Sequence, residues 1–167
     1  MMKIIVPALM LAMAAAVPRV AAEPLDPGKA TIGQLDTSVL LGIDGDPAVA
    51  GKRAVEADAE LAKRLRSEKR LKFSHYRLLG SDRRGVFRSY ENWAQPLAPS
   101  DEVLVRFEAQ SAPTGERLRL DLELWLSRKK ILKTDAVVTG DHPIFILGPA
   151  WRGGRLIVVL GLAPEAK

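Results

Sequence analysis

Asp121 and Glu123 are the two residues of this sequence best spaced for acid–base chemistry. If residues 118–126 form a strand, the two carboxylates share a face and lie about 7 Å apart, which suits paired acids in glycoside hydrolysis. Arg117, Arg119 and Trp125 fall on the same face. Alternating charges on an outward strand face are usually solvated or paired with the neighbouring strand, so we favour that interpretation over catalysis.

The two histidines do not have the spacing of a metal site. His75 falls in an expected strand and His142 precedes Pro143 in an expected turn, whereas a zinc site takes three or four ligands. The sequence contains no cysteine, which excludes disulfides, thiolate ligands and thiol nucleophiles. We therefore expect no bound metal and no cofactor.

Three further motifs are each better explained by local structure than by chemistry. Ser74 and His75 are adjacent on an expected strand, so their side chains point to opposite faces. Residues 44–46 (Asp-Gly-Asp) supply only half of a calcium loop and suit a turn followed by a helix cap. The glycines at 153–154 lack the lysine and the helix of a phosphate loop. We expect no catalytic residues.

Aromatic and basic side chains supply a candidate interaction surface, because aromatic rings on a sheet face can stack on sugars or on a protein partner. The alternative, which we favour, is that a loop at residues 91–100 folds across the sheet and buries the aromatic rings as a second core layer. The candidate interaction surface comprises Trp125, Trp93, Tyr90, Arg117 and Arg119.

Residues 63–72 form the densest charge run, with six basic residues and one acidic residue. Such a cluster has the charge to meet lipopolysaccharide, acidic glycans or an acidic patch on a partner. The interpretation we favour is the solvated end of a helix, where cations suit the negative end of the helix dipole.

The leucines of residues 118–126 alternate with charged residues and one tryptophan. This period of two predicts a central strand of an antiparallel sheet with every leucine on one buried face. A helix is expected from residue 47 to about residue 69, where apolar residues recur at helical spacing. The remaining expected strands are residues 38–43, 71–80, 86–90, 103–109, 131–139, 144–147 and 155–160, with turns or loops at 81–85, 91–100 and 148–154.

These elements predict an α+β fold in which one amphipathic helix packs on a mostly antiparallel, sandwich-like β-sheet. The length of 167 residues suits one domain. We expect a signal peptide at residues 1–22, a flexible leader at 23–36, a single α+β domain at 37–162 and a tail at 163–167. The segment at 155–160 is almost continuously apolar, so we expect it to be covered on both faces.

The N-terminus has the pattern of a secretory signal peptide. Lys3 is followed by an apolar run at residues 4–17, and small residues precede an expected cleavage after Ala22. The run is shorter than the roughly 20 residues that span a bilayer. Cleavage removes Lys3 and Arg19 from 25 basic residues and none of the 20 acids, so the net charge falls from +5 to +3. This mild charge and the expected export argue against nucleic acid as a partner.

Several short motifs resemble a group of uncharacterised exported bacterial proteins of planctomycete, verrucomicrobial and myxobacterial type. In that group a short strand leads to an Asp-Pro helix start, then to a Phe-x-x-Tyr-Arg-Leu-Leu strand and an antiparallel sheet. The matching motifs are Asp46-Pro47, Phe73 to Leu79, Gly148-Pro149 and Gly153 to Ile157, within a stretch from Val39 to Leu160. The resemblance implies an envelope protein near secretion or outer-membrane machinery, and it brings no catalytic residues.

The function that we expect is a non-catalytic exported envelope protein, periplasmic or extracellular, that serves as a protein-interaction or assembly module. It would have an envelope or secretion-machinery partner and no membrane span after signal cleavage. The alternative is a carbohydrate-active or hydrolytic envelope domain that uses the acids and tryptophans of the sheet.

Overall fold

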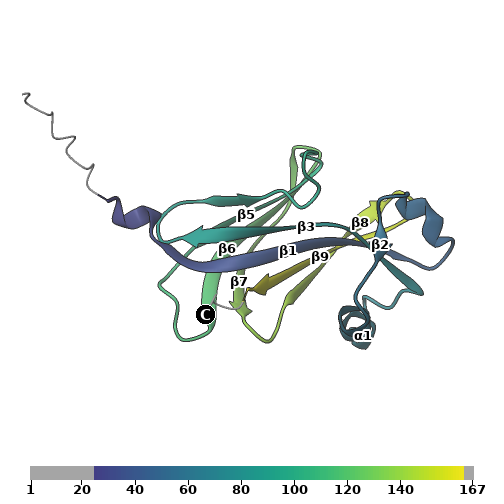
Figure 1. The fold of residues 1–167 in the computed structure, drawn as a ribbon, viewed down its shortest axis with the longest axis horizontal. Helices are drawn as coiled ribbons and strands as arrows, with labels where there is room; N and C mark the ends of the chain where they lie inside the picture. The colour runs from purple at the N-terminus through teal and green to yellow at the C-terminus, as the bar shows by residue number, and fades with distance from the viewer. Residues whose placement is uncertain (1–24, 164–167) are drawn as a thin grey trace, which may run out of the picture.

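The computed structural model describes residues 25–163 (Figure 1). The expected signal peptide and all but the first residue of the expected tail therefore lie outside the described residues. Within residues 25–163, no helix is long and apolar enough to cross a membrane.

Two antiparallel sheets form most of the described chain. The first sheet has the strand order β2-β3-β1-β9-β8, and the second has the order β4-β5-β6-β7. The strands are β1 (Thr31–Ile43), β2 (Val55–Glu56), β3 (His75–Phe87), β4 (Asn92–Ala94), β5 (Val103–Ala109), β6 (Arg117–Leu126), β7 (Lys129–Thr139), β8 (Ile144–Trp151) and β9 (Gly154–Leu162). The helical segments are η1 (Pro27–Lys29), η2 (Pro47–Ala50) and α1 (Ala59–Ser67). One helix with mostly antiparallel sheet confirms the α+β class.

The leucines of β6 occupy the position that their alternation predicts. Leu118, Leu120 and Leu122 are at most 1% exposed and Leu124 is 3% exposed. Their core cluster also contains Leu35 of β1 and Leu156, Val158 and Leu160 of β9, so the inner faces of both sheets contribute to it. Burying these aliphatic side chains provides the main driving force for bringing the two sheets together.

β9 confirms the prediction of a strand covered on both faces. Leu156, Val158 and Leu160 belong to the core shared with the second sheet, whereas Ile157 and Val159 face a smaller cluster with Ala62 and Leu65 of α1. In Figure 1, α1 lies beside the end of β1 that is remote from the second sheet. Along β9, the first sheet therefore packs against the second sheet on one face and against the α1 cluster on the other.

The long helix predicted from residue 47 is wrong in its first half. Pro47–Ala50 form only a 3-10 turn, which ends at Gly51 with a φ of 88°, a conformation that favours glycine. Val55 and Glu56 then pair with β3 as β2. The helix begins only after Asp58, whose side chain accepts hydrogen bonds from the backbone N–H groups of Glu60 and Leu61. Its buried stripe consists of Ala62 and Leu65.

β3 is one continuous strand, so the turn predicted at residues 81–85 is wrong. Its polar stretch pairs with β1 through Ser38 opposite Ser81 and Asp36 opposite Arg83. The Arg83 guanidinium and the Asp36 carboxylate form two hydrogen bonds across the strands. Polar residues commonly indicate a turn, but here the length of the neighbouring strand β1 keeps them in the ladder.

Other predicted boundaries also change. β1 starts at Thr31, so the leader predicted to be flexible is wrong for residues 31–36. The region 91–100, predicted as a loop, contains β4, which pairs with β5. β8 continues to Trp151 with a register irregularity between Leu147 and Ala150, where a loop was predicted. In each case the added residues pair with a partner strand, which short-range patterns do not reveal.

Candidate functional site

The outer face of the four-stranded sheet brings together two of the predicted surface residues. Trp93 of β4 stands opposite Arg106 of β5, and Trp125 of β6 stands opposite Leu104 of β5. The two indole rings lie 5.9 Å apart between centroids and are inclined at 55°. Trp93 is 38% exposed. The prediction that a loop buries these aromatic rings is therefore wrong, because residues 92–94 extend the sheet instead of folding across it.

Arg106 lies at the centre of the charged groups on this face. Its guanidinium forms ion pairs with Glu91 at 2.7 Å, Glu108 at 2.7 Å and Asp121 at 3.3 Å. The hydrogen bond to Glu91 raises the pKa of Arg106 further above its usual value. The same bond, together with one from the Trp93 indole, lowers the pKa of Glu91. Three acids from three chain segments thus converge on one cation.

Glu123 is held as an anion although it is only 5% exposed. Burial by itself raises the pKa of this carboxyl, but hydrogen bonds from Lys130 at 3.1 Å and from the Trp125 indole at 3.0 Å produce a net lowering. Lys133 lies 3.4 Å from Glu123 and 3.1 Å from Asp121, so one ammonium bridges the two acids. A general acid needs a carboxyl that keeps its proton, whereas the contacts of Glu123 favour its ionised form.

The tryptophans are oriented by these same acids. The Trp93 Nε1–H donates to Glu91 at 3.3 Å and the Trp125 Nε1–H donates to Glu123 at 3.0 Å. The Lys130 ammonium lies 5.5 Å from the centre of the Trp125 ring. Because both indole N–H groups are engaged on the face, apolar ring surface is what the pair offers to an incoming molecule.

The other three predicted surface residues do not join the tryptophan pair. Arg117 and Arg119 are exposed on β6, about 20 Å or more along the strand from Trp125. Arg119 approaches Asp135 at 4.0 Å. Tyr90 is 45% exposed, and its hydroxyl donates to Asp26 at 2.6 Å, which ties it to the start of the described chain. The tryptophan face is therefore defined here as Trp93, Trp125 and the ion pairs around them.

The remaining motifs have local structural roles. Asp44 accepts hydrogen bonds from Ser74, and Asp46 caps the 3-10 turn, as the turn-and-cap interpretation predicts. His142 contacts its neighbour Asp141 at 2.8 Å. Among residues 25–163, no three or more histidine, cysteine or acidic side chains are grouped closely enough to hold a metal ion.

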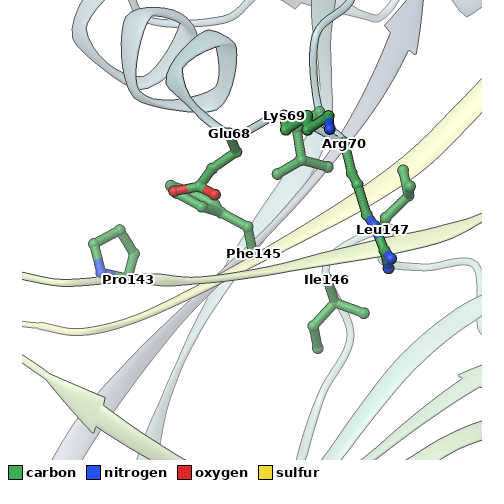
Figure 2. A pocket seen from close by; sticks show the side chains of 8 residues that line it. Glu68, Lys69, Arg70, Pro143, Phe145, Ile146 and Leu147 are labelled. Atoms are coloured by element: carbon green, nitrogen blue, oxygen red, sulfur yellow. The ribbon is translucent and has the colours of Figure 1, made fainter.

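A second candidate site, which the sequence did not predict, is an open groove of about 630 Å³ between the segment after α1 and the edge strand β8. Figure 2 shows Phe145 and Leu147 on one side of β8 and Ile146 on the other, with Arg70 extending past Leu147. The lining residues are Glu68, Lys69, Arg70, Leu71, Pro143, Phe145, Ile146 and Leu147. The available signal was the uncharged apolar run at residues 144–147, directly after the turn at Pro143.

Comparison with family models, curated proteins and solved structures finds no match to this chain.

Proposed function

We propose that this chain is a non-catalytic exported envelope protein that serves as a protein-interaction or assembly module, and that the tryptophan face contacts its partner. Export is supported by the signal-peptide pattern of residues 1–22 and by the resemblance to exported bacterial proteins. The core that the two sheets share supports a sandwich-like scaffold. An envelope or secretion-machinery protein is the partner that this location favours.

The observation that carries the proposal is a pair of neighbouring tryptophans on an outer sheet face, one exposed and one half-buried, whose neighbouring charges are already paired. Tryptophan and arginine are enriched among the residues that contribute most to protein–protein binding. Neither the groove beside β8 nor the one between β1 and β3 at residues 36–38 and 81–83 includes a residue of this face. A sheet face that lies outside both grooves suits another folded protein better than a small substrate, which needs a concave site.

The alternative function, a carbohydrate-active or hydrolytic envelope domain, is favoured by one observation: exposed indole rings can stack on sugar rings. The acids beside them argue against hydrolysis. Asp121 and Glu123 share the Lys133 ammonium, and the lowered pKa of Glu123 leaves it without the proton that a general acid must donate.

A photo-crosslinking amino acid at position 93 tests the proposal. The matched control is the same amino acid at Val137, which is 46% exposed and stands opposite Arg119 on the same outer face. After irradiation in envelope extracts, we expect one defined envelope protein to be crosslinked from position 93 and not from position 137. Adding Trp125→Ala to the chain that carries the crosslinker at position 93 should reduce that yield several-fold, because this substitution removes the neighbouring indole.

Equal crosslinking from both positions, or none from position 93, would contradict the proposal. Quenching of tryptophan fluorescence by soluble cell-wall glycans, with turnover that is lost in Asp121→Asn or Glu123→Gln, would establish the alternative instead.

A further inference from the structure

Strand β8 leaves one edge of the five-stranded sheet open. It pairs only with β9, and no backbone hydrogen bond from residues 144–151 reaches any other element of the described chain. Every second residue of an edge strand directs its N–H and C=O groups away from the sheet. These groups are ready to pair with an added strand.

The stretch of β8 from Ile144 to Leu147 is apolar and incompletely buried. All four of its side chains are half-buried, and none carries a charge. Pro149 and the register irregularity after Leu147 limit regular pairing beyond this stretch. An added strand would therefore pair along residues 144–147, beside the groove that Figure 2 shows.

The wall of the groove opposite β8 has a net positive charge, because Lys69 and Arg70 outnumber the one acid, Glu68. Lys69 and Arg70 are exposed and line the groove directly. They belong to the run at residues 63–72, whose six basic side chains make no ion pair within residues 25–163. Arg64 instead donates to the backbone carbonyl of Asp141 at 2.6 Å, and so links the α1 segment to the turn before β8. The unpaired positive charge calls for acidic groups on the occupant.

The two faces of β8 determine which alternation of side chains suits an added strand. Phe145 and Leu147 contribute to the cluster under α1, whereas Ile144 and Ile146 pack on the core shared by the sheets. Side chains of an added strand alternate in the same way. One set would lie beside Lys69 and Arg70, and the other would extend the apolar row of Ile144 and Ile146.

We propose that the β8 edge binds an extended peptide segment of a partner protein by strand addition, and that this segment alternates apolar and acidic residues. Main-chain hydrogen bonds to β8 would provide affinity, and the alternating side chains would provide specificity. The inference goes beyond the proposed function, because it concerns a second surface that shares no residue with the tryptophan face.

A second copy of this chain is a poorer occupant. Joining two β8 strands antiparallel in one continuous sheet places the symmetry axis perpendicular to that sheet. The two α1 segments would then lie on the same face of the combined sheet. Their unpaired cations would lie beside the new β8–β8 strand pair. Like charges brought together in this way oppose association.

The test uses the full-length chain and a short fluorescein-labelled peptide in which valine and glutamate alternate, with binding followed by fluorescence anisotropy. One control peptide has the same composition in two blocks, which removes the alternation. A second control replaces glutamate by lysine. We expect saturable binding of the alternating acidic peptide, about tenfold or more tighter than that of either control. Amide hydrogen exchange should slow at residues 144–147 in the same complex.

The matched variants are Lys69→Glu with Arg70→Glu, and Lys52→Glu with Arg53→Glu. Lys52 and Arg53 are exposed and precede β2, at the opposite edge of the same sheet, so the two variants change the net charge equally. We expect the first pair to weaken binding about tenfold and the second to leave it nearly unchanged. Trp93→Ala should not affect this binding, which separates the inference from the proposed function.

Three results would overturn the inference: no saturable binding, equal binding of the block peptide, or equal loss in both charge variants. Protection of residues 144–147 in the free protein that depends on protein concentration would show that a second copy occupies the edge instead.

Discussion

β7 and β8 are both edge strands, yet they present different surfaces. β7 carries Lys129, Lys130, Lys133 and Asp135, whereas β8 has no charged residue from Ile144 to Trp151. Charged side chains, lysine in particular, are a common means of keeping an edge strand from pairing with another chain. By this criterion β7 is protected and β8 is open.

The charges of β7 are also engaged. Lys130 and Lys133 form ion pairs with Glu123, and Lys133 reaches Asp121 as well. Lys69 and Arg70, which line the groove beside β8, make no such pair among residues 25–163. The positive charge thus differs between the two regions: on β7 it neutralises acids of the same sheet, and in the groove beside β8 it has no ion pair among the described residues.

The largest expected effect tests whether the core is equally well packed next to the two edge strands. Leu122 lies on β6, which pairs with β7, and Leu160 lies on β9, which pairs with β8. Both side chains are 0% exposed. We expect Leu122→Ala and Leu160→Ala each to lower the free energy of unfolding by about 3 kcal/mol. Urea denaturation measures both. A much smaller loss for Leu160→Ala would mean that β8 is open because its sheet is weakly packed, and the comparison of surface charge would fail.

A smaller effect follows from the acids that β7 neutralises. The pKa of Glu123 is lowered in the folded protein, so its ionised form stabilises the fold above the ordinary carboxyl pKa of about 4.3, and this contribution is lost as pH falls through the lowered value. The urea midpoint should therefore fall on acidification below about pH 4.5. Glu123→Gln should flatten this dependence, because position 123 then no longer titrates.

A pH dependence of the urea midpoint that is the same in Glu123→Gln and in the unsubstituted chain would contradict this prediction, and would remove the distinction that β7 draws between engaged and unengaged charges.

The sequence correctly predicted the strands whose hydrophobic pattern depends only on which side chains are buried. The alternating leucines of β6 and the continuous apolar run of β9 have the burial that their patterns indicate. The errors concern segments whose structure depends on a distant partner. Residues 81–85 have the composition of a turn, but they stand opposite β1 across the ladder. Residues 55–56 fall within a stretch of helical spacing, but they pair with β3.

The candidate sites show the same division. The outward direction of Trp125 followed from the period of β6, but its place beside Trp93 required the pairing of β4 with β5, which the sequence did not indicate. The β8 edge was missed for a related reason. An apolar run such as residues 144–147 predicts a strand, but it does not show whether a neighbour covers both sides of that strand. Only the strand order reveals an unpaired edge.

The smallest effect compares one lysine from each region directly. Lys133→Ala removes the ammonium that bridges Asp121 and Glu123, so the remaining carboxylates repel each other and the urea midpoint at neutral pH should fall slightly. Lys69→Ala removes a cation without an acidic partner among the described residues, so the midpoint should not fall. High salt should reduce the loss in Lys133→Ala, because it screens the repulsion between the acids. An equal fall in both variants would show that the cations beside β8 already stabilise the fold, and they would then not be free to bind a partner.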